Sequence, residues 1–172
     1  MNYGAAAMTA PADEPSPPRA TAHGVAGLRA LVGGKFGPTA WRTVGQADID
    51  AFARLTGDRQ WIHVDVERAA REGPFGTTVA HGNLTLSLID GFRDELMETT
   101  GFTLGVNYGW NKVRFPAPVP SGSRLRGRVE VLSLDDAGGG WWQVVQRWTV
   151  EREGFEKPVC VADSVGRVLL LP

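Results

Sequence analysis

The apolar positions of this chain change from helical spacing in its middle to strand-like alternation in its last third. A helix is predicted over 47–55, where Ile49, Phe52 and Leu55 share one face and Gly57 follows as a stop signal. A shorter helix is predicted in VDVERAAREG, with Asp65 near its start. A longer one follows the histidine of HGNLTLSLIDGFRDELM. It is apolar around so much of its circumference that we expect it to be buried on several sides.

The last third predicts four antiparallel strands. They lie in VNYGWNKVRF, SRLRGRVEVLSL, WWQVVQRWTVERE and PVCVADSVGRVLLL. A hairpin turn is predicted at 135–140 and a break at 116–122, and a short first strand at 39–44. One sheet wrapped around one long helix satisfies this order. Since one sheet face would stay open, a dimer with two sheets joined edge to edge is the natural completion.

Composition narrows the class of protein. The 172 residues fit one domain, at 27–172, after an Ala/Pro-rich leader at 1–26 that lacks the pattern of a secretory signal and is expected to be poorly ordered. A net charge of −1 without a basic cluster gives no support for nucleic acid as a partner, and no apolar run is long enough to span a membrane. The single cysteine, Cys160, reads as a small core residue and fits a reducing cytoplasm.

Three arginines, Arg124, Arg126 and Arg128, alternate along the second of these strands. Such a run is usually a solvated strand face. The alternative is a contact with an anionic tail of a substrate.

Candidate chemistry begins in the stretch TGDRQWIH, which holds Asp58 and His63 five residues apart. Five residues diverge by about 140° on a helix and fall on opposite faces of a strand. The two side chains therefore converge only if the chain after Gly57 is irregular, with Trp61 and Ile62 anchoring it in the core. They could then form a catalytic pair, since loops often carry function. The alternatives are an ordinary surface acid and histidine, or a metal site.

That metal site would use His63 and His81 with Asp65, a weak pattern for metal ligands. His81 also opens VAHGNLTLSL, where Gly82 stands at the first turn of the long helix. A glycine there allows a ligand oxygen close to the backbone, and free N–H groups at the helix start favour developing negative charge. His81 itself either holds the loop as a structural histidine or takes part in the chemistry.

Together, TGDRQWIHVDVERA and VAHGNLTLSL resemble the MaoC-like, (R)-specific enoyl-CoA hydratases. That family carries a stretch of the form G-D-x-N-P-(apolar)-H. The resemblance runs from about residue 39 to the C-terminus and is similar to the nodulation-protein-N-like branch. The chain departs from the pattern at Gln60 and Trp61, where Asn and Pro are usual. A serine that supports the pair in the family falls at Asp90, with Ser87 nearly one turn earlier.

The resemblance implies an α+β hot-dog fold, in which a long central helix is wrapped by an antiparallel sheet of about five strands. It also implies a homodimer and a thioester substrate carried on coenzyme A or acyl carrier protein, as in fatty acid metabolism. No metal or redox cofactor is expected. The implied reaction is the reversible hydration of trans-2-enoyl thioesters to (R)-3-hydroxyacyl thioesters. Asp58 and His63 would hold the water, and the N–H of Gly82 would donate to the thioester oxygen.

Further substrate contacts are expected from two groups of residues. Beside the pair, the substrate-binding candidates are Gln60, Trp61, His81 and Asn83. In VNYGWNKVRF, Asn107 would meet the thioester or pantetheine, and Arg114 or Lys112 a phosphate, unless these are only an exposed strand face.

Two other functions stay open. A hot-dog thioesterase would place a carboxylate near the start of the long helix, where Asn83, Thr85 and Ser87 stand and Asp90 comes later. A non-catalytic acyl-CoA-binding protein would account for the departure from the family pattern at Gln60 and Trp61.

Overall fold

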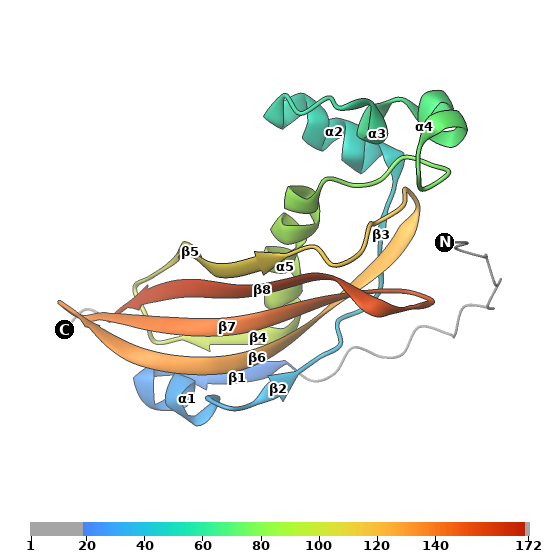
Figure 1. Cartoon of the computed structure of the whole chain (residues 1–172). Helices are drawn as coiled ribbons and strands as arrows, with labels where there is room; N and C mark the ends of the chain where they lie inside the picture. The colour runs from blue at the N-terminus through green and yellow to red at the C-terminus, as the bar shows by residue number, and fades with distance from the viewer. Residues whose placement is uncertain (1–18, 171–172) are drawn as a thin grey trace.

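The fold was analysed in a computed structural model that describes residues 19–170 (Figure 1). Its helices are α1 (Gly24–Ala30), α2 (Gln46–Thr56), α3 (Trp61–Val64), α4 (Val66–Glu72) and α5 (Gly82–Leu96). Its strands are β1 (Ala20–His23), β2 (Lys35–Phe36), β3 (Arg42–Val44), β4 (Met97–Thr100), β5 (Leu104–Arg114), β6 (Ser123–Gly138), β7 (Trp141–Arg152) and β8 (Phe155–Leu169).

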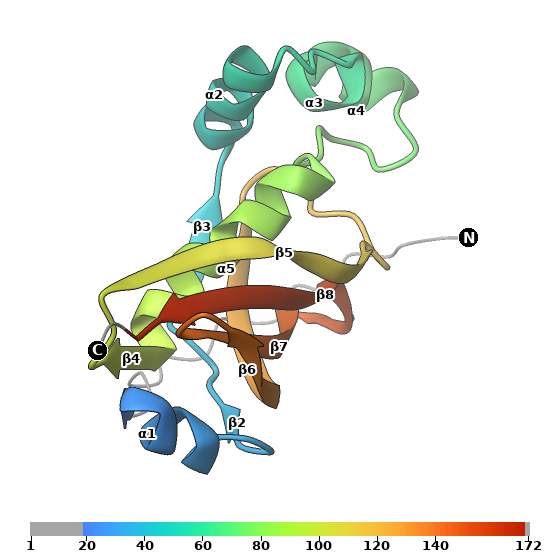
Figure 2. The ribbon, with the colours of Figure 1, turned by 90° about the vertical axis from the view of Figure 1, so that its left-hand side faces the viewer.

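The main sheet is antiparallel and runs in the order β2-β6-β7-β8-β5, with β3 also paired to β6. All four strands predicted in the last third are present, and the predicted hairpin turn lies between β6 and β7, where Gly138, Gly139 and Gly140 have positive φ. The sheet curves around α5, which lies against one of its faces (Figures 1 and 2). This is the expected hot-dog fold.

The contact between α5 and the sheet depends on one close approach. Ile89, Phe92 and Leu96 of α5 are fully buried. On β6, Leu125 and Val129 face the same core, and Gly127 lies between them. A Cβ atom at Gly127 would lie 2.8 Å from the Phe92 ring, so only glycine lets the helix pack this closely. The approach holds the second half of α5 against β6, and the candidate site lies at the other, amino end of the helix.

The predicted helices before α5 are confirmed and begin and end as their sequence indicates. Asp48 accepts a hydrogen bond from the N–H of Gly45 at the start of α2 (2.9 Å), and Gly57 ends that helix with φ +81°. Asp65 caps α4 by accepting a hydrogen bond from the N–H of Arg68 (3.0 Å). Together α2, α3 and α4 form a layer beyond the amino end of α5 (Figure 2).

The leader was expected to end at residue 26, but the folded part of the chain begins earlier. Residues 1–18 of the leader lie outside the described residues, but residues 20–26 form β1 and the start of α1. β1 pairs in parallel with β4, and Ala22 and Leu28 are buried in the core. The Ala/Pro-rich composition of residues 1–26 gave no sign that Ala22 is buried, because that burial accompanies the pairing of β1 with β4 from a distant part of the sequence. The helix α1 likewise begins inside the expected leader, at Gly24.

The arginine run of β6 is an ion-paired strand face. Arg126 and Arg128 both bond Glu151 of β7 (Nε to carboxylate oxygen, 2.7 and 2.9 Å), and Arg124 bonds Glu153 (2.9 Å). These opposite-charge pairs across neighbouring strands account for the run without a substrate tail.

Cys160 is fully buried, as expected of a core residue. Burial raises the pKa of its thiol to about 11, which keeps the thiol protonated near neutral pH. Between residues 19 and 170, no helix has both the length and the hydropathy needed to cross a membrane.

Candidate active site

The segment that carries the acid and the histidine is irregular, as the five-residue spacing requires. After α2 ends at Gly57, residues 58–60 have no regular structure, and the short helix α3 then begins at Trp61. Asp58 therefore extends from a loop, and His63 from a single helical turn. The change of direction between them aims both side chains at one place.

His63 is held by hydrogen bonds on two sides and is only 7% exposed. Its Nδ1 lies 2.7 Å from the carbonyl oxygen of Val79. Since a carbonyl can only accept, Nδ1 carries the hydrogen, and Nε2 of the neutral ring has a free lone pair. The main-chain oxygen of His63 accepts a hydrogen bond from Nε2 of Gln46 (2.8 Å), which ties α3 to α2. His63 is therefore positioned to accept a proton at Nε2.

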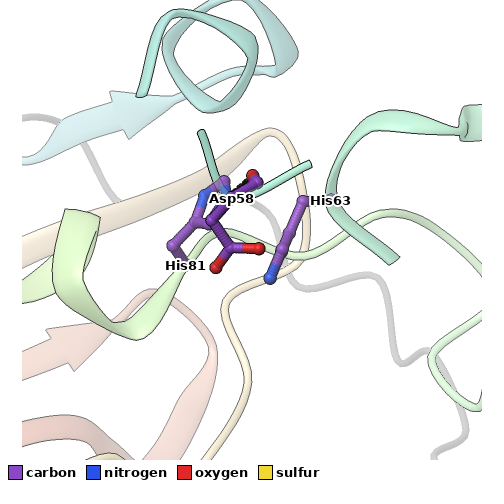
Figure 3. Close-up of side chains that lie close together, drawn as sticks. All are labelled: Asp58, His63 and His81. Atoms are coloured by element: carbon purple, nitrogen blue, oxygen red, sulfur yellow. Dashed lines mark hydrogen bonds between the residues drawn. The ribbon is translucent and has the colours of Figure 1, made fainter. Parts of the chain in front are cut away.

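The Asp58 carboxylate points to the region that the His63 ring nitrogen also faces (Figure 3). One carboxylate oxygen of Asp58 and one ring nitrogen each of His63 and His81 lie within 4.8 Å of one another. Hydrogen bonds of about 2.8 Å to each side let one water molecule bridge groups at that separation. Asp58 itself is exposed, so water can reach the site.

His81 lies behind this pair and is 3% exposed. Its Nε2 is 3.0 Å from the main-chain oxygen of Asp58 (Figure 3). Its ring stacks on that of His63, with centroids 3.8 Å apart and an interplanar angle of 26°. The ring of Phe52 from α2 lies 5.1 Å away.

The amino end of α5 completes the site. Gly82 is the first residue of the helix, so its N–H has no partner within the helix and lies at the positive end of the helix dipole. The close approach expected at Gly82 is made by a protein group: a Cβ there would lie 2.8 Å from the ring of Phe115. Beside them is an open cavity of about 340 Å³, lined mainly by apolar groups that include Ile62, Phe115 and Val159.

The three potential metal ligands Asp58, His63 and His81 do not suit an ion. Ligating imidazoles must direct their in-plane lone pairs at one point about 2.1 Å away. Because the two rings are stacked, with centroids 3.8 Å apart and planes inclined by only 26°, an ion in the plane of one ring would lie out of the plane of the other. Asp65, the acid in the metal set considered from the sequence, caps α4 instead.

The chain is similar to proteins of known family. The profile of the MaoC like domain matches residues 28–152. The chain is 50% identical over 147 residues to 3-hydroxyacyl-thioester dehydratase Z of Mycobacterium tuberculosis, covering 86% of this chain and 97% of that protein. The chain belongs to the MaoC-like dehydratase family.

Two further relatives are consistent with that membership. Nodulation protein N of Rhizobium leguminosarum bv. viciae is 41% identical over 142 residues, 82% of this chain and 88% of that protein. Among solved structures, the R-hydratase PhaJ1 of Pseudomonas aeruginosa superposes with a TM-score of 0.62 at 25% identity, covering 81% of this chain and 83% of that chain. Both the family and the nodulation-protein-N-like resemblance are therefore confirmed.

In this MaoC-like chain, several residues expected at the site lie beside the pair. Gln60 is exposed; its N–H is 3.4 Å from Oδ1 of Asp58, and its carbonyl oxygen accepts from the N–H of His63 (2.9 Å). Asn83 follows Gly82 in the first turn of α5 and is also exposed. Trp61 is only half-buried and packs under the guanidinium of Arg68 (4.4 Å), so it does not anchor the loop in the core as expected.

The two expected substrate contacts on β5, Asn107 and Arg114, lie toward different ends of α5. Asn107 lines a separate cavity of about 330 Å³ with Arg93 and Asp94, from the half of α5 farther from Gly82. Arg114 is exposed at the end of β5 and donates to the carbonyl oxygen of Val113 (2.8 Å). Sequence order could not reveal which end of α5 each part of β5 would meet.

Neither candidate for the supporting serine position contacts the pair. Asp90 forms an ion pair with Arg93 (2.8 Å) on the exposed side of α5, and Ser87 donates to the carbonyl oxygen of Asn83 (2.8 Å). The buried hydroxyl in this part of the helix belongs to Thr85, 3.4 Å from the carbonyl oxygen of His81. The acid that a thioesterase would need is therefore directed away from the site.

Two residues that organise the site, Gln46 and Phe115, were not expected from the sequence. Gln46 bonds His63 through its amide nitrogen and accepts a hydrogen bond from the buried Thr78 hydroxyl (2.5 Å). Phe115, the residue directly after the long strand β5, covers Gly82. No local pattern marks either residue, because their partners are 17 to 33 positions away in the sequence.

Proposed function

We propose that this protein catalyses the reversible hydration of trans-2-enoyl thioesters to (R)-3-hydroxyacyl thioesters, equivalently the dehydration of the latter. The observation that carries the proposal is the meeting of the Asp58 carboxylate and the His63 ring within reach of one water molecule, beside the amino end of α5. The relatives named dehydratase and R-hydratase support the reaction class and its stereochemistry.

In hydration, the neutral His63 ring accepts a proton from the water at Nε2. The water oxygen adds to C3, and the electron pair of the double bond moves through C2 to the thioester oxygen. The resulting imidazolium returns a proton to C2, so the sum is addition of one water. The Asp58 carboxylate accepts a hydrogen bond from the second O–H of the water, whose hydrogen stays on the oxygen, and stabilises the transient imidazolium by its opposite charge. Dehydration is the reverse sequence.

The amino end of α5 stabilises the intermediate. As enolate character grows, negative charge collects on the thioester oxygen, and the N–H of Gly82 donates to it. Loss of one such donor typically costs about 10²–10³ in rate. The thioester is carried on coenzyme A or on acyl carrier protein, and either carrier leaves this chemistry unchanged.

The working unit proposed here is a homodimer. β5 is a long edge strand, and Leu104, Val106 and Tyr108 on it are exposed at 48, 39 and 59%. A long apolar edge strand is prone to pair with another strand. A second copy joined along β5 would cover these side chains and extend the sheet.

The reaction is tested with trans-2-enoyl-CoA substrates from C4 to C16, following the loss of the conjugated double bond. Asp58→Asn and His63→Ala should each lower the rate by at least about 10², because each removes one contact to the water. Asp65→Asn is the matched control: it changes a neighbouring carboxylate that caps α4, and it should keep the parent rate.

Circular dichroism should show that both catalytic variants fold as the parent does. Near-parent rates in both variants would contradict the proposed roles. Release of free coenzyme A would instead indicate a thioesterase, and binding without turnover at every chain length an acyl-CoA-binding protein.

A further inference from the structure

His81 contacts both members of the proposed catalytic pair, although the mechanism above gives it no chemical step. It bonds Asp58 through Nε2 and stacks on the ring of His63. It is also the residue that immediately precedes α5, next to Gly82. One side chain therefore joins the acid, the base and the start of the helix.

The bond from His81 is the shortest of those to Asp58 in the described chain. The N–H of Asp58 lies 3.4 Å from Oγ1 of Thr56, and the N–H of Gln60 lies 3.4 Å from Oδ1 of Asp58. The His81 bond to the Asp58 carbonyl is 3.0 Å. Asp58 otherwise stands on an exposed, irregular loop, so this bond is the main restraint on its main chain.

The stacking contact restrains His63 from the other direction. The bond from Nδ1 to Val79 fixes one edge of the His63 ring but leaves the ring free to rock about that bond. A flat ring 3.8 Å away, tilted by only 26°, blocks that motion on one face. His81 in turn is held in place by Phe52.

The remaining nitrogen of His81 supports this role. A carbonyl oxygen can only accept, so Nε2 of His81 carries the hydrogen and Nδ1 is the acceptor nitrogen. Nδ1 is buried and, within residues 19–170, has no hydrogen-bond partner. A buried polar atom without a partner is unfavourable, so its presence calls for an explanation. A ring that both donates to Asp58 and stacks on His63 supplies one.

We propose that His81 is a positioning residue that sets the separation of the Asp58 carboxylate and Nε2 of His63, and hence where the water is held. This inference rests on the proposed hydratase function. A displacement of about 1 Å in such an arrangement can cost about 10² in rate.

The test separates the two contacts with three variants. His81→Ala removes both, His81→Gln keeps an N–H donor for the Asp58 carbonyl, and His81→Phe keeps a ring that can stack on His63. On crotonyl-CoA, His81→Ala should lower kcat by at least about 10-fold and change KM by less than about 3-fold. The Gln and Phe variants should each recover part of kcat. Rates are expressed per folded protein, as measured by circular dichroism.

A rise in KM with kcat unchanged in His81→Ala would overturn the inference, because His81 would then bind substrate directly. Equal losses of kcat in all three variants would also overturn the inference, because neither the donor kept in His81→Gln nor the ring kept in His81→Phe would then restore any activity.

A second measurement needs no turnover. The imidazole nitrogen shifts of the parent protein, read by NMR, should show hydrogen on Nε2 of His81 and on Nδ1 of His63. The reverse arrangement at His81 would overturn the inference even if the protein proved to have another activity. If this arrangement is found but no enoyl thioester is hydrated, the failure belongs to the proposed function.

Discussion

Adding one methyl group between α5 and the sheet should destabilise the protein strongly. In Gly127→Ala the new Cβ would lie 2.8 Å from the ring of Phe92, which is fully buried and cannot turn toward solvent. Overpacking of this kind typically costs about 1–3 kcal/mol. For a chain of this size, about 2–4 °C of melting temperature accompanies each kcal/mol, so Tm should fall by about 2–12 °C.

Gly82→Ala provides a close comparison, because its Cβ would also lie 2.8 Å from a phenylalanine ring. That ring belongs to Phe115, which is 42% exposed and can turn toward solvent. Alanine is also favoured over glycine in a helix by up to about 1 kcal/mol. The Tm of Gly82→Ala should therefore stay within about 3 °C of the parent, despite the identical distance.

Thermal unfolding followed by circular dichroism measures both effects. Gly109→Ala is the control, since nothing lies within 4 Å of its added Cβ. Replacing Phe92 by leucine should cost less in Gly127→Ala than in the parent, because it relieves the overlap. Equal losses in Gly82→Ala and Gly127→Ala would refute the argument, as would a Gly127→Ala variant that melts with the parent.

Two further predictions concern acid stability and assembly. Arg147 donates to both carboxylate oxygens of Asp163 (2.8 and 3.0 Å), and these bonds lower the pKa of that acid from its ordinary value of 3.8. The ion pair therefore stabilises the fold above pH 3.8, and this stabilisation is lost as the pH falls through the lowered pKa. Asp163→Asn should therefore cost about 1 kcal/mol in urea unfolding at pH 7 and progressively less below pH 3.8. In Val106→Lys on the β5 edge, light scattering should detect monomers. Leu55→Lys, at an 85% exposed residue of α2, should remain dimeric. A parent protein that is itself monomeric would contradict the proposed dimer.

Local sequence signals proved reliable where the cause is itself local. The end of α2 follows from Gly57, the start of α4 from Asp65, and the alternation of β6 from the burial of every second residue. The convergence of Asp58 and His63 could also be argued, because neither regular element allows it at a spacing of five.

Predictions about partners distant in the sequence were less successful. Asn107 was expected at the thioester but lines a cavity at the other end of α5, and Trp61 packs under Arg68 instead of in the core. Residues 20–26 were assigned to the leader, although pairing with β4 makes them part of the fold. In each case the deciding contact comes from an element that the local pattern does not specify.

The sequence by itself determined the helices α2, α4 and α5 and the four long strands of the sheet, that an irregular turn separates the acid from the histidine, and to which family these motifs are similar. Only the tertiary structure decided which nitrogen of His63 is free, because that depends on the carbonyl of Val79 brought beside it. The stacking of His81 on His63, and the direction of Asp90 away from the catalytic pair, were likewise visible only in the tertiary structure. The physical reason is that periodicity and propensity act over one or two turns, whereas hydrogen-bond partners and ring contacts depend on the packing of whole elements.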